Sequence, residues 1–278
     1  MARWRKLGVI AGAGALPRLL ADAAGEVFVV RLAGVADEAY PPERSAECGI
    51  AESGKILRVL KDAGCDAVTL AGVVRRPDFS KLKPDWRGAA LLPRVIAAAA
   101  KGDGAMLSVL VETLEAEGFL VVGAEEVLAS LAAPSGPIGA HAPSADHWAD
   151  IKKAAAIVAA LGPYDVGQAA VVASGFTLAI EAAEGTDGVL ARCAALPASA
   201  RGGDRRNGVL VKRPKPGQER RIDLPTVGVD TLKGAHAAGL AGVAVEAGAT
   251  LIIDIDAVRR EADRLQLFVY GFSPAELK

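Results

Sequence analysis

Short apolar runs alternate with helically spaced apolar residues along the first half of the chain. The runs predict strands at residues 7–11, 27–32, 66–71 and 119–122. The helical spacing predicts helices at residues 16–24, 54–63, 92–100 and 105–117, the second of them capped by Ser53 and ended by Gly64. Strands that alternate with helices indicate βαβ units and a mainly parallel sheet.

The second half continues this alternation after a segment rich in Pro, Gly and Ser. Strands are predicted at 168–174 and 176–182, joined by a tight turn at Ser174-Gly175, and at 208–212, 242–245, 250–253 and 267–270. Helices are predicted at 146–161, 230–238 and 256–265, and from a cap at Thr186 or Asp187 to residue 196. We interpret residues 133–145 as a linker between two domains, 1–132 and 146–278, which suits a chain of 278 residues.

Composition narrows the class of protein. Hydrophobic residues make up 51% of the chain, enough for a substantial core, and the formal net charge of −1 argues against a nucleic-acid partner. Three widely spaced cysteines form no CxxC pair, which favours a reducing cytoplasm over a disulfide framework. No run reaches the roughly 18 apolar residues of a membrane span, and glycines and Pro17-Arg18 interrupt the basic start, so we expect no signal peptide.

The first strand ends in a glycine turn, Gly12-Ala13-Gly14, directly before a helix. Such a turn lets the backbone approach a phosphate, and the helix N-terminus favours an anion. The dinucleotide fingerprint is incomplete, because Pro17 stands at its third small position and Arg31-Leu32 ends the second strand without an acid. A tight βα turn without a ligand is an equally good interpretation.

Three aspartates lie among glycines or beside basic residues: Asp103 in KGDG, Asp187 in EGTDG and Asp223 in RIDLPT. Carboxylates in turns suit a site where Mg²⁺ is shared between protein and phosphate oxygens. Asp103 and Asp187 could equally cap helices. Asp223 precedes Leu224-Pro225 and has no helix to cap nearby.

A cationic loop occupies residues 212–223. Pro214 and Pro216 stiffen it, and Gln218 adds a neutral amide. Rigid presentation of cations is typical of anion recognition, although an exposed basic face is the alternative. We expect these basic side chains to be exposed and to add little to folding stability. They are Lys212, Arg213, Lys215, Arg220 and Arg221.

The order of these motifs resembles one protein family over essentially the whole chain. The motifs are KLGVIAGAGALP, AGVVRRPDF, KGDG, GQAAVV, EGTDG, RPKPGQER, RIDLPTVGVDTL and AGLAGVAVEAG. They resemble the LpxI-type UDP-2,3-diacylglucosamine pyrophosphatases of lipid A biosynthesis. The resemblance implies a two-domain α/β protein with an N-terminal Rossmann-like parallel sheet, a second α/β domain and the ligand in the cleft between them. It also implies hydrolysis of UDP-2,3-diacylglucosamine to lipid X and UMP with Mg²⁺ or Mn²⁺.

The resemblance further implies roles for individual residues. Asp223, Lys212 and Lys215 would be catalytic, and Asp103, Asp187 and Asp223 would hold the metal, although Gly104 stands where the family often has a second acid. The partners implied are the substrate and lipid X, a second copy of the chain, and a peripheral contact with the inner membrane. The substrate-binding residues would be Gly12, Ala13, Gly14, Gly72, Val73, Arg75, Lys101, Gln168, Thr186, Gln218 and Thr226.

Two other function classes stay open. The glycine turn favours a nicotinamide-dependent oxidoreductase, which would lack the usual ribose-binding acid and is tested by titration with NAD. A non-catalytic module that binds a nucleotide or a lipid would retain substrate without converting it.

Overall fold

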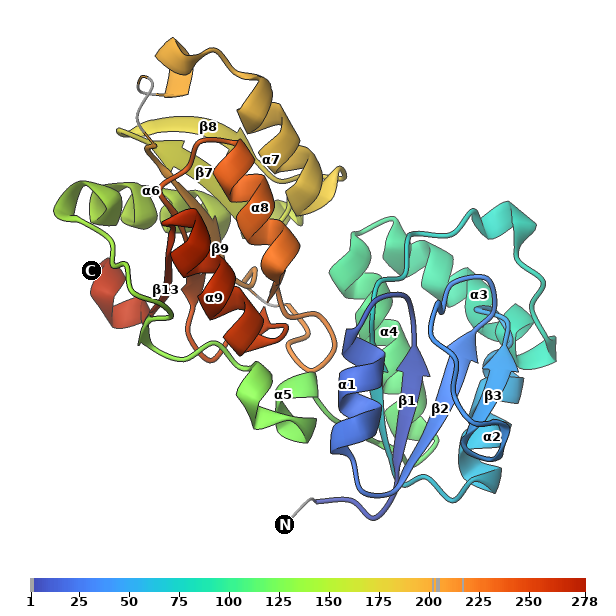
Figure 1. Ribbon diagram of the computed structural model, residues 1–278. Coiled ribbons are helices and arrows are strands. Elements are labelled where there is room, and N and C mark those ends of the chain that lie inside the picture. Colours follow the sequence, from blue (N-terminus) through green and yellow to red (C-terminus); the bar gives the residue numbers. More distant parts are fainter. Residues whose placement is uncertain (1–2, 202, 204–205, 217) are drawn as a thin grey trace. The chain divides into compact units, whose positions relative to one another are not determined.

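A computed structural model describes residues 3–201, 203, 206–216 and 218–278. The chain divides into two compact units (Figure 1). Unit 1 comprises residues 1–129 together with 219–223, and unit 2 comprises 130–218 and 224–278. The α/β class, with a parallel sheet in the N-terminal part and a second α/β unit, is as the sequence predicted.

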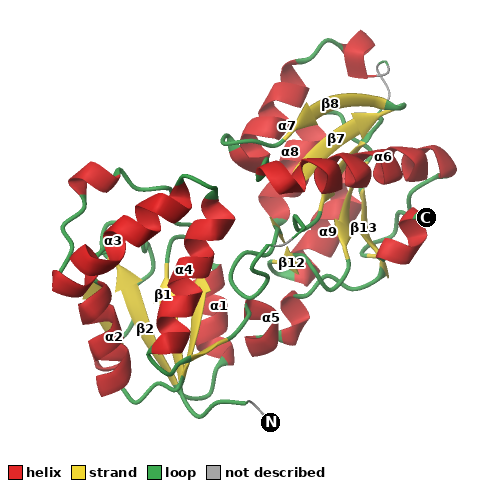
Figure 2. Ribbon diagram, turned by 180° about the vertical axis from the view of Figure 1, so that it is seen from behind, coloured by secondary structure: helices red, strands yellow, loops and turns green. Residues whose placement is uncertain are grey.

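Unit 1 is a parallel sheet flanked by helices (Figure 2). Its sheet has the order β3-β2-β1-β4-β5, and every neighbouring pair is parallel. β2 and β3 lie on one side of β1, and β4 and β5 lie on the other. The strand order therefore reverses between β1 and β4. The elements are β1 (Leu7–Ala11), α1 (Leu16–Ala23), β2 (Val27–Leu32), β3 (Ser45–Cys48), α2 (Ser53–Asp62), β4 (Ala67–Ala71), α3 (Trp86–Ala99), α4 (Asp103–Ala116), β5 (Leu120–Val121) and α5 (Ala124–Val127).

The core of unit 1 lies between the sheet and helices α2 and α4. Ile56, Leu57 and Leu60 of α2 meet buried side chains of β2 and β4, and Val111 and Leu114 of α4 join the same cluster. Helix α1 packs against β1 and β2 instead. Strand β3 was missed in the sequence because only the last of its four residues is buried, so it has no apolar pattern.

One carboxylate fixes the start of two helices. Asp85 accepts hydrogen bonds from the backbone N–H of Gly88 in α3 (2.7 Å) and of Lys55 in α2 (2.8 Å). The predicted Ser53 cap is therefore wrong: Ser53 is the first residue of α2, and a distant side chain satisfies the free N–H. For the same reason α3 begins at Trp86, six residues before the predicted start.

Unit 2 has a mixed sheet of six strands in the order β6-β13-β11-β9-β7-β8 and a separate pair, β10-β12. Its centre, β13-β11-β9, is parallel, whereas β7, β8 and β6 are antiparallel to their neighbours. The elements are β6 (Gly136–Pro137), α6 (Ala145–Leu161), β7 (Ala169–Ala173), β8 (Phe176–Ile180), α7 (Gly185–Ala195), β9 (Val209–Lys212), β10 (Thr226–Val227), α8 (Val229–Ala237), β11 (Gly242–Glu246), β12 (Leu251–Ile252), α9 (Ile255–Leu265) and β13 (Phe268–Phe272).

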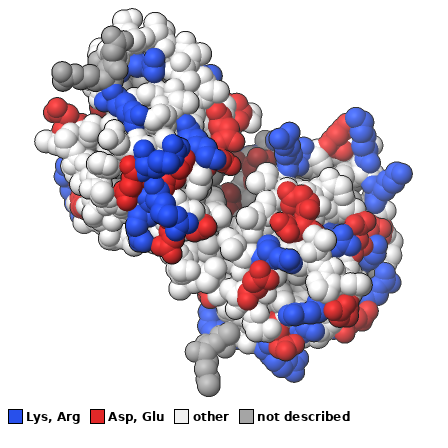
Figure 3. Space-filling view, in the orientation of Figure 1, with Lys and Arg blue, Asp and Glu red and all other residues white. Residues whose placement is uncertain are grey.

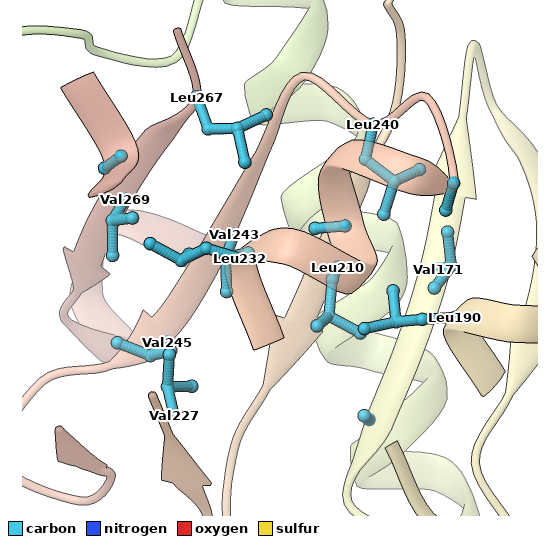
Figure 4. Close-up of a cluster of buried hydrophobic side chains, with 14 of the residues drawn as sticks. Val171, Leu190, Leu210, Val227, Leu232, Leu240, Val243, Val245, Leu267 and Val269 are labelled. Carbon is cyan, nitrogen blue, oxygen red and sulfur yellow. The ribbon is translucent and has the colours of Figure 1, made fainter. Parts of the chain in front are cut away.

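Both faces of this sheet are buried, which explains the unbroken apolar runs of its central strands. Residues that alternate along each strand join two separate clusters, one against α6 and one against α7, α8 and α9. Figure 4 shows the second cluster, in which strand side chains meet those of the helices. Labelled there are Val171, Leu190, Leu210, Val227, Leu232, Leu240, Val243, Val245, Leu267 and Val269.

Residues 133–145, predicted as a linker, are packed into unit 2. Gly136 and Pro137 form β6 beside β13, Ile138 is 2% exposed, and the Ala133 N–H donates to the Thr250 carbonyl (2.9 Å). The segment thus forms part of a core and of a sheet. None of the helices in the described part of the chain has both the length and the apolar character needed to cross a membrane.

Candidate functional site

The two loops that follow β1 and β4 are joined through their backbones. The Ala13 N–H donates to the Val73 carbonyl (3.0 Å), and the Val73 N–H donates back to the Ala13 carbonyl (2.8 Å). The Gly12 N–H donates to the Ala71 carbonyl (2.8 Å). The loops lie at the carboxyl ends of the strands where the strand order reverses, the position at which open parallel sheets bind ligands. Five predicted substrate-binding residues are therefore neighbours: Gly12, Ala13, Gly14, Gly72 and Val73.

This close approach requires glycine at two positions. A Cβ on Gly12 would lie 2.8 Å from the Val73 carbonyl oxygen. Gly72 has a φ of +90°, and a Cβ there would lie 2.6 Å from the Ala13 carbonyl oxygen. The close approach of the two loops is therefore a sufficient reason for glycine at both positions, independent of any ligand.

The Gly14 amide already has an anionic partner. Its N–H lies 3.0 and 3.1 Å from the two carboxylate oxygens of Asp37, an exposed residue that the sequence analysis missed. An amide at a glycine turn is a natural donor to phosphate. In this structure a carboxylate of the same unit takes that place.

The other predicted residues of unit 1 lie on its surface. Arg75 and Lys101 are exposed. Asp103 is the first residue of α4, and Gly102 holds the N-cap position in its place. The Asp103 carboxylate lies 3.7 Å from the guanidinium of Arg76, and both side chains are more than half exposed.

A buried polar network forms the centre of the candidate site in unit 2. The Lys212 ammonium donates to the Thr186 hydroxyl and to the Thr226 carbonyl, both at 2.8 Å. The Thr186 hydroxyl donates to Glu181 Oε1 (2.7 Å), and the second oxygen of Glu181 accepts the Gln168 N–H (2.8 Å). Four predicted residues, on β7, α7, β9 and β10 or directly beside them, are thereby joined in one network through the Glu181 carboxylate and the Lys212 ammonium.

Burial governs the electrostatics of this network. Lys212 is 5% exposed and Glu181 is 6% exposed. Burial lowers the pKa of Lys212, while the negative charges of Glu181 and Asp187 act to raise it. The expectation that Lys212 is exposed is wrong, because its strand β9 is central in the sheet and buried on both faces. Asp187 is exposed and is the third residue of α7, not its cap.

Glu181 was missed in the sequence. It lies inside the strand predicted at 176–182 and was not considered as a site residue, and in the structure it follows directly after β8. A charged residue at the end of an otherwise apolar strand could have drawn attention to it. Its hydrogen-bond partners Thr186 and Gln168 lie 5 and 13 residues away, and Lys212 and Thr226 lie further along the chain, so no local motif contains the network.

Most cations of the 212–223 loop have carboxylate partners within the chain. Lys215, whose side chain is 12% exposed, pairs with Asp165, and Arg213 pairs with Glu246 at 2.9 Å. Gln218 Oε1 accepts the Lys215 N–H (2.8 Å), and Gln218 Nε2 donates to Gln168 Oε1 (3.3 Å). The expected exposure of Lys215 is also wrong, and its neighbourhood is held rigidly by hydrogen bonds.

Asp223 lies in the short segment that belongs to unit 1. Ile222 packs against the α2/α4 core, and the Asp223 N–H donates to the Glu219 carbonyl (3.1 Å). Arg221 donates to both oxygens of Glu219 (2.8 and 2.7 Å) and to Glu115 of α4 (2.6 Å). The backbone that carries Asp223 is therefore anchored on both sides of the turn by apolar packing and ion pairs.

The three aspartates predicted to hold a metal do not all belong to one unit. Asp103 and Asp223 lie in unit 1 and Asp187 in unit 2. No group of three His, Cys, Asp or Glu side chains in the described ranges could by itself hold a metal ion. The carboxylate oxygens are nonetheless the donors that Mg²⁺ prefers, and Mg²⁺ commonly uses only one or two of them together with water and phosphate oxygens.

Comparisons with known proteins cover nearly the whole chain. The model of the LpxI N-terminal domain matches residues 6–131, and that of the LpxI C-terminal domain matches residues 134–270. The chain is 50% identical over 277 residues to the UDP-2,3-diacylglucosamine pyrophosphatase LpxI of Caulobacter vibrioides, an alignment that spans 98% of this chain and 99% of that protein. Two domain matches in the expected order, and identity of this extent over nearly the whole length, establish that the chain belongs to the LpxI family.

Proposed function

We propose that this protein hydrolyses the pyrophosphate bond of UDP-2,3-diacylglucosamine, giving 2,3-diacylglucosamine 1-phosphate and UMP, a step of lipid A biosynthesis. The observation that carries the proposal is the 50% identity over nearly the whole chain to a protein named for that activity. It is supported by the buried cationic network of unit 2, which joins Lys212, Thr186, Gln168 and Thr226.

In the proposed reaction, water adds to one phosphorus as the P–O–P bridge breaks. Negative charge grows on the phosphate oxygens in the transition state, where a fixed positive charge lowers the barrier most. Lys215 is the more accessible of the two lysines and would contact the diphosphate directly. Lys212 is too buried for this, and it would act by holding the Thr186 hydroxyl and the end of β10 in place.

Asp223 would activate or orient the attacking water. Its backbone is fixed by Ile222 and by the ion pairs of Arg221, so the carboxylate is not carried on a freely moving loop. Asp103, Asp187 and Asp223 would share Mg²⁺ with the diphosphate. When bound, the ion would supply positive charge to the phosphate oxygens. That the ligand binds between the two units, and that the protein is a cytoplasmic homodimer, stay predictions.

The direct test incubates the purified full chain with UDP-2,3-diacylglucosamine, with and without Mg²⁺, and separates the products by thin-layer chromatography. We expect UMP and lipid X in equal amounts, and none after the metal is chelated. Product formation that is unaffected by chelation would remove the metal from the proposal. Retention of intact substrate would identify a binding module, and saturable binding of NAD without hydrolysis would favour an oxidoreductase.

A further inference from the structure

Helix α3 of unit 1 exposes a continuous apolar face. Trp86 is 77% exposed and Ile96 is 43% exposed, and small apolar residues at helical spacing lie between and beyond them. Large apolar side chains at this exposure are uncommon when they share one face of a helix. We call these residues the α3 stripe: Trp86, Ala89, Ala90, Pro93, Ile96, Ala97 and Ala100.

Positive charge surrounds the α3 stripe. Residues 83–103 contain four cations and two carboxylates, Asp85 and Asp103, so the segment carries a net positive charge. Lys83 lies just before the stripe and Lys101 just after it, and neither has an ion-pair partner within the described ranges. Arg87 and Arg94 flank the stripe and pair with Glu117 and Glu112 of the α4 region, in exposed or half-exposed pairs that contribute little.

The stripe lies at the same edge of the sheet as the glycine turns. The bond from Lys55 to Asp85 places the start of α3 beside the start of α2, which follows β3. The bond from Arg76 Nη2 to the Ala99 carbonyl (2.9 Å) places its end beside the loop that follows β4. Figures 1 and 2 both show α3 beyond the tips of the strand arrows. Val73, which is 64% exposed, is part of that same loop.

We propose that the α3 stripe docks unit 1 on the surface of an anionic lipid bilayer. Trp86 and Ile96 would enter the boundary between headgroups and acyl chains, where tryptophan is preferred. Lys83 and Lys101 would lie against lipid phosphates at the two ends of the stripe. The inference rests on the proposed function in one respect, since a substrate with two acyl chains partitions into a membrane and has to be taken from it.

Charge favours a bilayer over a second copy of the chain. Figure 3 shows both signs of charge interspersed on one face of the molecule. Two stripes packed antiparallel would place Lys83 against Lys101. The nearest carboxylates already have partners in their own chain, since Asp85 accepts two backbone N–H groups and Asp103 lies 3.7 Å from Arg76. A bilayer rich in phosphatidylglycerol offers both an apolar interior and negative charge.

The test is flotation of the purified full chain with vesicles of phosphatidylglycerol and phosphatidylcholine, and with vesicles of phosphatidylcholine alone. We expect binding to the anionic vesicles that weakens as salt is added. Trp86→Ser combined with Ile96→Ser should weaken binding about tenfold or more, because two apolar side chains no longer leave water. The matched control is Phe176→Ser, which removes a 73% exposed aromatic from unit 2 and should leave binding unchanged.

A second measurement does not depend on those serine variants folding. In the parent, brominated lipid should quench tryptophan emission, and Trp86→Phe should retain vesicle binding while losing most of that quenching. Absence of vesicle binding at low salt, or equal binding by the double serine variant, overturns the proposal. A dimer that the double variant dissociates would assign the stripe to a second copy instead. Hydrolysis of a short-chain, water-soluble substrate should be the same in parent and double variant, which separates this result from a failure of the proposed activity.

Discussion

The candidate residues of the two units are held in place by different kinds of atoms: backbone atoms at the glycine turns of unit 1, and buried charged side chains in unit 2. In unit 1, Gly12, Gly72 and Val73 take part through backbone atoms, and the loops close on each other without a charged side chain. In unit 2, Lys212 and Glu181 are buried charges, held through Thr186. The first arrangement is sensitive to any added side-chain atom, and the second to the loss of one charge.

The two arrangements should respond differently to amino-acid substitution. A change in the glycine turns introduces a steric clash and backbone strain, which cost about 1–3 kcal/mol. A change that removes one member of a buried charge pair leaves the other charge buried without a partner. The free-energy cost of taking that charge out of water is then no longer offset. We therefore expect larger effects in unit 2 than in the turns of unit 1, and larger effects still at the residue that takes part in the reaction.

Asp223→Ala should have the largest effect, on rate and not on stability. Loss of a group that activates or orients water lowers kcat by about 10²- to 10⁴-fold. Substrate binding should be largely retained, because uridine, sugar and acyl contacts do not depend on this carboxylate. The measurement is kcat for the purified variant, with lipid extraction and mass spectrometry to detect intact substrate that co-purifies.

Asp223→Asn is the matched control, since it keeps the shape of the side chain and removes its charge. It should be as inactive as the alanine variant. Activity of either variant within about tenfold of the parent would exclude Asp223 from the reaction and leave Asp103 or Asp187 as candidates.

Lys212→Ala should lower the free energy of unfolding by about 3–5 kcal/mol, because Glu181 remains buried without its cation. Combining Lys212→Met with Glu181→Gln removes both charges and should recover most of that loss. The control is Lys233→Ala, which removes a lysine that is 57% exposed beside Asp230 and should change little. Urea unfolding measures all three. An equal loss in the single and double variants would show that the two charges are not coupled.

The pH dependence of stability sharpens the same test. Burial lowers the pKa of Lys212 below its ordinary value of 10.5, so in the folded chain this lysine loses its proton at lower pH than in the unfolded chain. Between those two pKa values the unfolded chain binds more protons, and stability rises with pH. That rise should be present in the parent below pH 10.5 and absent from the double variant.

Lys215→Ala should lower kcat/KM by an amount equivalent to about 2–4 kcal/mol, as expected when a positioned cationic donor is removed from a phosphate site. Asp165→Asn breaks the same ion pair but leaves the cation in place. If Lys215 only pairs with Asp165, both variants lose stability alike and neither loses kcat/KM. A loss of kcat/KM in the lysine variant alone would assign it to the diphosphate.

Local sequence predicts the elements of this fold and the glycine turns well. The turns are readable because glycine itself marks a positive φ or a close backbone approach, as at Gly72 and Gly12, although the loop that approaches each one is distant in sequence. The helix starts were less predictable. Asp85 caps α2 from thirty residues away, and nothing near Ser53 indicates this.

The network of unit 2 was predicted only in part. Thr186, Lys212 and Thr226 were predicted, but Glu181, which accepts the hydrogen bond of Thr186, belongs to no motif. Burial of Lys212 depends on the position of β9 in the centre of the sheet, which composition of the loop does not reveal. The location of residues 219–223 in unit 1 depends on tertiary packing of Ile222.

Among the alanine substitutions at candidate residues, Gly72→Ala should have the smallest effect. We expect a loss of about 1–3 kcal/mol in the free energy of unfolding. A positive φ of +90° and a contact of 2.6 Å with the Ala13 carbonyl both oppose a side chain here. Gly64→Ala separates the two causes, because Gly64 has a φ of +74° and open space around its Cβ position. It should cost only about 1 kcal/mol, from backbone strain alone. Equal losses in the two variants would mean that the loops after β1 and β4 can separate freely, and the backbone closure of unit 1 would then not be a rigid feature.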